Sequence, residues 1–134
     1  MKLLANILRF EEHFQRMRKL VEKDLSDYFV ATALAMECFQ AVNALIEMGE
    51  FLVIQKRLGA PASYREIFEL LHANGWLSNE ELQTAKRLVF LRNVIAHEYQ
   101  KLRPEDLREA VELLAHMERF IETVRRSVGK LGPV

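Results

Sequence analysis

The chain has 134 residues, of which 50% are hydrophobic, and its 19 basic and 19 acidic side chains give a formal net charge of zero. This length and composition predict one domain, residues 1–134, with a sizeable core. They exclude a general polyanion binder, so any contact with nucleic acid requires a local patch of positive charge.

Cysteine content and charge placement predict a cytoplasmic protein. Cys38, the single cysteine, lies in an apolar run, which indicates a buried and reduced thiol. No signal peptide is expected, because the N-terminal apolar pattern soon meets Arg9, Glu11 and Glu12. No membrane span is expected either, because three glutamates interrupt the most apolar region, residues 29–54, and a span needs ~20 mostly apolar residues.

Two long helices are predicted first. Apolar residues recur every three or four positions between Leu3 and Val21, which is typical of a helix with one buried stripe. His13 lies off that stripe and is expected in solvent. Ser26 or Asp27 can cap the second helix by accepting a hydrogen bond from a backbone N–H group.

The second helix is apolar on most sides and is therefore expected at the centre of the fold. Its polar residues step by three, three, four and three positions, which places them in one narrow stripe: Glu37, Gln40, Asn43, Glu47 and Glu50. Burying unpaired carboxylates is costly, so the stripe must face water, a cation or a partner subunit. Either it is a solvated or interface face, or Glu47 or Glu50 borders a functional cleft and pairs with a cation such as Arg92.

Gly59 and Pro61 are expected to stop the second helix near residues 56–57. Ser63 and Glu66 then have the spacing of a capping box, which predicts a short helix that ends at the Asn-Gly pair 74–75.

A fourth helix is expected from about Asn79, behind a second capping box formed by Ser78 and Glu81. Pro104 opens a last helix, which ends before a frayed tail at residues 129–134. The predicted fold is all-α: an antiparallel up-down bundle of four main helices plus one short helix.

The most informative stretch is Arg-Asn-Val-Ile-Ala-His-Glu-Tyr, residues 92–99, at the end of the fourth helix. Arg92 is a permanent planar cation suited to phosphate, and His97 can exchange protons near neutral pH. Asn93 and Tyr99 add hydrogen-bonding groups. Together these residues could act on a phosphodiester. Alternatively, an arginine and a histidine at a helix end only complement the helix dipole.

The spacing of Arg92 and His97 complicates a joint role for these two residues. Arg92 and His97 are five residues apart, about 140° around an ideal helix. The helix could loosen near His97, the long Arg92 side chain could reach round, or a second subunit could supply its own copy across a two-fold axis. Arg92 and Tyr99 are seven apart and are expected on one face.

The pattern Arg-Asn-x-x-x-His-x-Tyr resembles the Arg-x4–6-His signature of HEPN domains, in the form found in the HepT toxin subfamily. The loop at residues 58–64, the Gly-Trp-Leu turn at 75–77 and the Leu-Arg-Asn at 91–93 are similar to that family too, so the resemblance covers essentially the whole chain. In the second helix, where HepT-like chains often carry an Asp-containing stretch, the nearest match is Ile46-Glu47-Met48, and no catalytic task is assigned to Glu47.

The resemblance implies a metal-independent ribonuclease that works as a homodimer, with no cofactor, and is the partner of an MNT-type nucleotidyltransferase antitoxin. In this interpretation His97 transfers protons, Arg92 stabilises charge on the phosphate, and Asn93 orients His97 or the substrate. Tyr99 would be the acceptor of AMP groups from the antitoxin. RNA is the expected substrate, and neither DNA nor a membrane is an expected partner. The alternative is a non-catalytic HEPN module that binds nucleotide or scaffolds a nucleotidyltransferase.

Overall fold

The computed structural model describes residues 2–130, which form six α-helices and one short 3-10 helix, with no strand among them. The elements are α1 (Lys2–Leu20), α2 (Tyr28–Gln55), α3 (Tyr64–Ala73), α4 (Asn79–His97), η1 (Tyr99–Lys101), α5 (Pro104–Ala115) and α6 (Glu118–Lys130). The prediction of an all-α helical bundle is confirmed.

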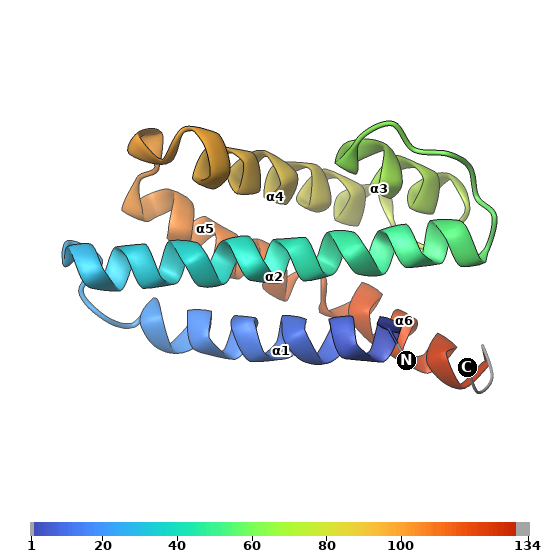
Figure 1. The fold of residues 1–134 in the computed structure, drawn as a ribbon, viewed down its shortest axis with the longest axis horizontal. Coiled ribbons are helices and arrows are strands. Elements are labelled where there is room, and N and C mark those ends of the chain that lie inside the picture. The colour runs from blue at the N-terminus through green and yellow to red at the C-terminus, as the bar shows by residue number, and fades with distance from the viewer. Residues whose placement is uncertain (1, 131–134) are drawn as a thin grey trace.

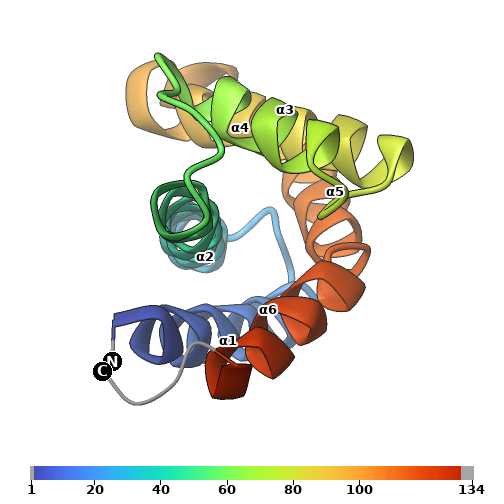
Figure 2. The ribbon, with the colours of Figure 1, turned by 90° about the vertical axis from the view of Figure 1, so that its right-hand side faces the viewer.

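The long helix α2 organises the bundle. It lies between α1 on one side and the α3–α4 pair on the other, and α1 and α4 both run antiparallel to it (Figure 1). Seen end-on, α3 and α4, α5, α6 and α1 follow one another in an arc around α2 (Figure 2). One long side of α2 is therefore left outside the arc, and the polar stripe of this helix is not forced into the core.

The composition of α2 follows from this central position. By length and composition alone, α2 is apolar enough to cross a membrane, because an 18-residue window has a mean hydropathy of 1.6 in spite of the glutamates. In the bundle, this helix packs against α1, α3, α4 and α5, and its apolar side chains form a large part of the core. Cys38 is fully buried there, as predicted, and burial raises the pKa of its thiol to about 12, which makes it a poor nucleophile.

The first helix keeps its predicted stripe, with Leu3, Ile7, Phe10, Phe14 and Met17 all at most 5% exposed. The prediction for His13 is wrong. The ring is half-buried between α1 and α2, where His13 Nδ1 lies 2.5 Å from a carboxylate oxygen of Glu37. Of the two candidate caps for α2, Asp27 is the one used, because its carboxylate accepts from the N–H groups of Phe29 and Val30.

Helix α2 ends close to the predicted position at residues 56–57, since its last residue is Gln55. The turn that ends it is made by Arg57, whose φ of +53° is left-handed, and not by Gly59. Arg57 N–H donates to Ile54 O at 3.2 Å and Leu58 N–H donates to Val53 O at 2.9 Å, which is the hydrogen-bond pattern of a Schellman motif. Glycine is usual at this position, so the sequence did not indicate that Arg57 would end the helix.

The last predicted helix is two helices. At the break, His116 N–H donates to both Glu112 O and Leu113 O, and Met117 N–H donates to Leu114 O at 3.0 Å, so the backbone tightens for one turn. The change of direction brings α6 against α1, where Arg18 pairs with Glu118. Of the predicted tail at 129–134, residues 129–130 belong to α6 and residues 131–134 lie outside the described part of the chain.

A buried carboxylate ties the start of α4 to α6 and makes stability depend on pH. Glu81 has a side chain only 9% exposed, accepts from Arg119 Nε at 3.0 Å, and completes the capping box with Ser78. Burial alone would raise the pKa of Glu81, but the hydrogen bonds from Arg119 and Ser78 outweigh it and hold that pKa below 4.5. Because the folded pKa is lowered, this stabilisation is present above about pH 4.5.

We therefore expect the contribution of Glu81 to fade as pH falls through its folded pKa. Glu81→Gln should lower the free energy of unfolding by roughly 1–2 kcal/mol at pH 7 and by less at pH 3. Urea unfolding at both pH values measures this, and Glu80→Gln, one residue earlier and exposed, is the matched control. An equal loss of stability at the two pH values would contradict the account.

Candidate active site

Side chains from two other helices, α2 and α3, fix the guanidinium of Arg92. Its Cζ lies 4.9 Å from the centre of the Phe39 ring on α2 and 5.1 Å from that of the Tyr64 ring on α3. Its Nε donates to Asn43 Oδ1 on α2 at 2.9 Å. Each cation–π contact is worth about 0.5–2 kcal/mol. The position of this charge is therefore set before any ligand arrives.

Arg92 retains donors for a ligand. Its Nη1 donates to Asn93 Oδ1 at 3.0 Å, in addition to the bond from Nε to Asn43. A guanidinium has five N–H groups in a planar fork, so three remain after these two bonds. This spare capacity suits a phosphate, which accepts two parallel hydrogen bonds from an arginine.

Arg92, Asn93 and His97 line one hollow of about 690 Å³, which we call the basic hollow. Its lining residues are Ala62, Ser63, Tyr64, Arg65, Val89, Arg92, Asn93 and His97. The volume lies within the range of about 300–1,000 Å³ that is usual for ligand sites. Arg92 and His97 thus border the same hollow in spite of the 140° between them around the helix.

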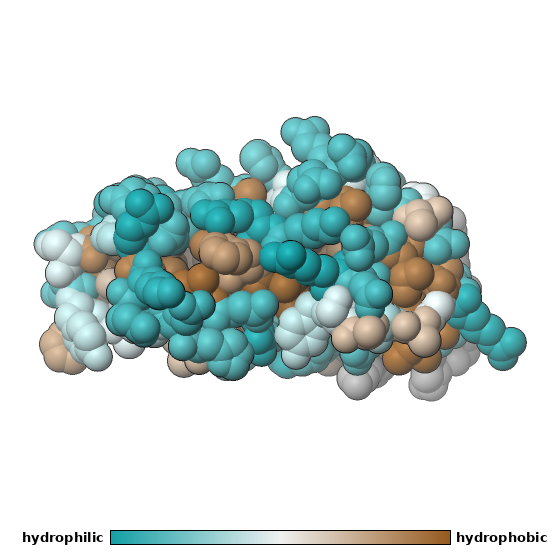
Figure 3. Space-filling view, turned by 90° about the horizontal axis from the view of Figure 1, so that it is seen from above, coloured by the Kyte–Doolittle hydropathy of each residue, from teal (hydrophilic) through white to brown (hydrophobic). Residues whose placement is uncertain are grey.

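Charge in the basic hollow has one sign, although the chain as a whole is neutral. Arg65, Arg92 and His97 contribute basic groups, and no carboxylate is among the side chains that line it. Asn93 and His97 are exposed, so a ligand can reach them from solvent. Viewed from above, the face over α3 and α4 is largely hydrophilic, with apolar surface visible between its polar groups (Figure 3). The basic groups that line the hollow are the kind of local patch that a polyanion would require.

Tyr99 lies outside the basic hollow. Helix α4 ends at His97, and Tyr99 begins η1, so the seven-residue spacing does not place it on the face of Arg92. Its hydroxyl donates to Thr32 Oγ1 on α2 at 3.4 Å, and its side chain remains 40% exposed. The ring is therefore accessible to a protein that approaches the end of α4.

Glu47 and Glu50 border a second, smaller hollow of about 250 Å³, together with Asn43, Ile46, Tyr64 and Arg92. Both residues therefore lie beside Arg92, and a functional role for this hollow stays a prediction. In the alternative with a functional cleft, Glu47 or Glu50 was to pair with Arg92, but Glu47 accepts a hydrogen bond from Arg9 on α1 instead. Asn43, from the same polar stripe, takes that place instead.

Sequence reasoning missed three residues of this site: Phe39, Asn43 and Tyr64. Asn43 belonged to a recognised polar stripe, and its position one turn before Glu47 was the available signal. Nothing local indicated that its partner would be Arg92, 49 residues later in the chain. Within residues 2–130, no three His, Cys, Asp or Glu side chains are close enough to hold a metal ion.

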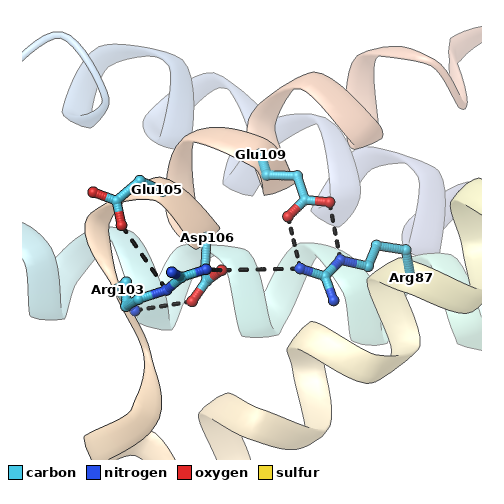
Figure 4. Close-up of polar contacts among 5 residues, drawn as sticks. All are labelled: Arg87, Arg103, Glu105, Asp106 and Glu109. Atoms are coloured by element: carbon cyan, nitrogen blue, oxygen red, sulfur yellow. Dashed lines mark hydrogen bonds and ion pairs between the residues drawn. The ribbon is translucent and has the colours of Figure 1, made fainter.

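A network of charges steadies the chain on either side of the motif (Figure 4). Arg87 on α4 donates from Nε and Nη2 to the two carboxylate oxygens of Glu109 on α5, both at 2.9 Å, and lies 3.9 Å from Asp106. Asp106 in turn accepts from the backbone N–H of Arg103 at 3.0 Å. The hydrogen bond from Arg87 holds the pKa of Glu109 below its usual value. The segment between His97 and Pro104 is thereby anchored where α5 begins.

The all-α bundle, with an arginine and a histidine of one helix beside one basic hollow, fits the HEPN-like class that the sequence motif resembles. The family model described as Ribonuclease HepT-like matches residues 3–124. The chain belongs to this HepT-like ribonuclease family.

Known relatives share the fold over nearly their whole length. The mRNA nuclease HepT of Shewanella oneidensis is 25% identical over 123 residues, which is 91% of this chain and 92% of that protein. A solved structure of tri-AMPylated S. oneidensis HEPN toxin in complex with MNT antitoxin matches with a TM-score of 0.84 at 24% identity, over 93% of this chain and 97% of that one. YutE of Bacillus subtilis, a cytosolic protein of unknown function, matches with a TM-score of 0.79 at 19% identity, over 97% and 94%.

Proposed function

We propose that this chain is the toxin of a HEPN/MNT toxin–antitoxin pair, a cytoplasmic endoribonuclease that cuts RNA without a metal ion or other cofactor. The observation that carries the proposal is the basic hollow, in which Arg92, Asn93 and His97 face the same space on an otherwise neutral chain. Membership of the HepT-like ribonuclease family and the similarity to an mRNA nuclease support it.

In this proposal the ribose 2′-oxygen attacks the adjacent phosphorus. His97 accepts the proton of the 2′-hydroxyl, and a proton returned by an imidazolium reaches the 5′-oxygen as its bond to phosphorus breaks. The products are a 2′,3′-cyclic phosphate and a free 5′-hydroxyl. Arg92 uses its remaining N–H groups to stabilise the charge that grows on the phosphate oxygens, which a pre-positioned donor does best. Asn93 helps to orient Arg92, to which it is hydrogen-bonded.

The proposed reaction needs one group that accepts the 2′-hydroxyl proton and one that donates a proton to the 5′-oxygen. Two imidazoles fill these two roles most simply. A homodimer that brings the partner's motif to the same phosphate would provide them. The exposure of His97 at the last residue of α4 makes such an approach sterically open.

Cleavage in the presence of EDTA tests the proposed reaction. Purified protein should cut RNA at a rate that does not change when EDTA is added, since no step uses a metal ion. A preparation of Arg92→Ala/His97→Ala protein, purified in the same way, controls for contaminating nuclease. A requirement for divalent metal would defeat this mechanism, and equal cleavage by the double variant would leave only the non-catalytic HEPN module that binds nucleotide or scaffolds a partner.

Regulation is proposed to occur at Tyr99, by AMP addition from an MNT-type antitoxin. The exposed hydroxyl beside Thr32 is accessible, and the negative phosphates would stand near the end of α4 and repel RNA. Co-expression with the antitoxin should add AMP-sized mass increments to the peptide that contains Tyr99. Tyr64→Phe should keep these increments and Tyr99→Phe should lose them. Their persistence in Tyr99→Phe protein would place the modification elsewhere.

A further inference from the structure

The smaller hollow next to Arg92 has the properties of a nucleobase site. It shares two lining residues, Tyr64 and Arg92, with the basic hollow, so the two spaces adjoin at this pair. A nucleotide whose phosphate meets Arg92 in the basic hollow could therefore place its own base, or that of its neighbour, in the smaller one. This reasoning rests on the proposed function.

The walls of the smaller hollow suit a planar ring. Tyr64 is 40% exposed, so its ring offers a flat surface on which a base can stack. Ile46, on the same hollow, adds an apolar contact. Aromatic stacking gives affinity for any base, so these walls alone set no preference among the four.

The polar groups of the hollow do set a preference. Glu47 is engaged by Arg9, and Asn43 Oδ1 is engaged by Arg92. Glu50 is exposed, and no side chain among residues 3–128 is hydrogen-bonded or ion-paired with it, so its carboxylate borders the hollow as an acceptor. Carboxylates repel phosphate, and the smaller hollow therefore favours a base.

We propose that the smaller hollow binds guanine, with Glu50 as the specificity-determining residue. A carboxylate has two oxygens in one plane and accepts two parallel hydrogen bonds. Among the four RNA bases, guanine alone presents two adjacent donors, N1–H and N2–H, on its Watson–Crick edge. The other bases place an acceptor beside their donor and would set a lone pair against the carboxylate. RNA bases that are unpaired expose this edge.

Binding of short RNAs tests the proposal apart from catalysis. A fluorescent oligouridine with a single guanosine, and the same RNA with inosine there, are titrated into full-length His97→Ala protein. Inosine lacks the N2 amino group. The guanosine RNA should bind about 10-fold tighter or more, since one good bidentate contact to a base discriminates by this order. Glu50→Gln should remove the difference, whereas Glu22→Gln, an exposed site on the turn after α1, should keep it.

Equal binding of the two RNAs, or a preference that survives Glu50→Gln, would overturn the inference. Cleavage of the guanosine RNA by the protein with His97 intact is measured in parallel. If the RNA is cleaved but guanosine is not preferred in binding, the guanine site is refuted and the proposed nuclease stands. If guanosine is preferred in binding but the RNA is not cleaved, the proposed nuclease is refuted and the guanine site stands.

Discussion

Replacing His97 by alanine is expected to reduce RNA cleavage by about 10²- to 10⁴-fold, the usual contribution of a positioned proton-transfer group. Arg92→Ala should reduce it by about 10²- to 10³-fold, because a fixed donor to the developing charge is lost. Arg92→Lys should recover only part of this loss. A lysine keeps the charge, but it lacks the planar fork that at once contacts Asn43, lies over the Phe39 and Tyr64 rings and offers donors to phosphate.

Initial rates on one RNA, with the fold of each variant checked by circular dichroism, give these factors. His116→Ala is the matched control, because this histidine is exposed at the end of α5 and lies outside the basic hollow. The His116→Ala protein should cut RNA at the same rate as the protein without substitutions. Full activity of folded His97→Ala protein would remove this residue from the chemistry.

Replacing Gly49 by leucine is expected to lower the free energy of unfolding by about 1–3 kcal/mol, the usual effect of overpacking a core. Gly49 is the point at which α2 approaches α3, and a Cβ there would lie 2.9 Å from Ile67 Cγ2 and 3.3 Å from Leu71 Cδ1. The Cγ2 methyl of a β-branched residue is held close to its own backbone, so α3 itself must move.

Such a shift has a second consequence in the basic hollow. Tyr64 begins α3 and lies against the Arg92 guanidinium, so moving α3 should disturb Arg92 and lower cleavage as well as stability. Ala33→Leu is the matched control: it adds the same side chain to an exposed position of α2 and should change stability by no more than about 0.5 kcal/mol. Urea unfolding and RNA cleavage on both variants test this, and a fully stable Gly49→Leu protein would contradict the packing described.

Features that depend on local sequence were predictable. The stripe of α1, both serine caps and the proline start of α5 each depend on residues within a few positions of one another, and each is where the pattern placed it. The main misses of the fold have local causes as well, but unusual ones. Arg57 takes the left-handed conformation expected of glycine, and the backbone tightens at His116 with no proline or glycine to mark the break.

The motif named Arg92, Asn93 and His97 as candidates, but the residues that hold Arg92 in place, Phe39, Asn43 and Tyr64, could not be predicted. A short motif pointed to Arg92 and His97, and the polar stripe of α2 pointed to the face that meets them. Asn43 and Glu47 were both possible hydrogen-bond acceptors for Arg92. Which of the two accepts the bond depends on how α2 and α4 pack, and the order of these residues in the sequence does not determine it. The same holds for the pairing of His13 with Glu37, since both lie on helices whose relative rotation sets the contact.

The proposed function depends on one chemical step, attack by the 2′-oxygen on phosphorus beside Arg92 and His97. The most direct test is cleavage of an RNA oligonucleotide against the same oligonucleotide with a single 2′-deoxyribose at the nucleotide 5′ to the cut. The deoxy substitution should abolish cleavage at that bond and leave other bonds cut as before, with 2′,3′-cyclic phosphate ends on the products. Cleavage of the substituted bond at an undiminished rate would show that another nucleophile attacks, and would contradict the proposed roles of both residues.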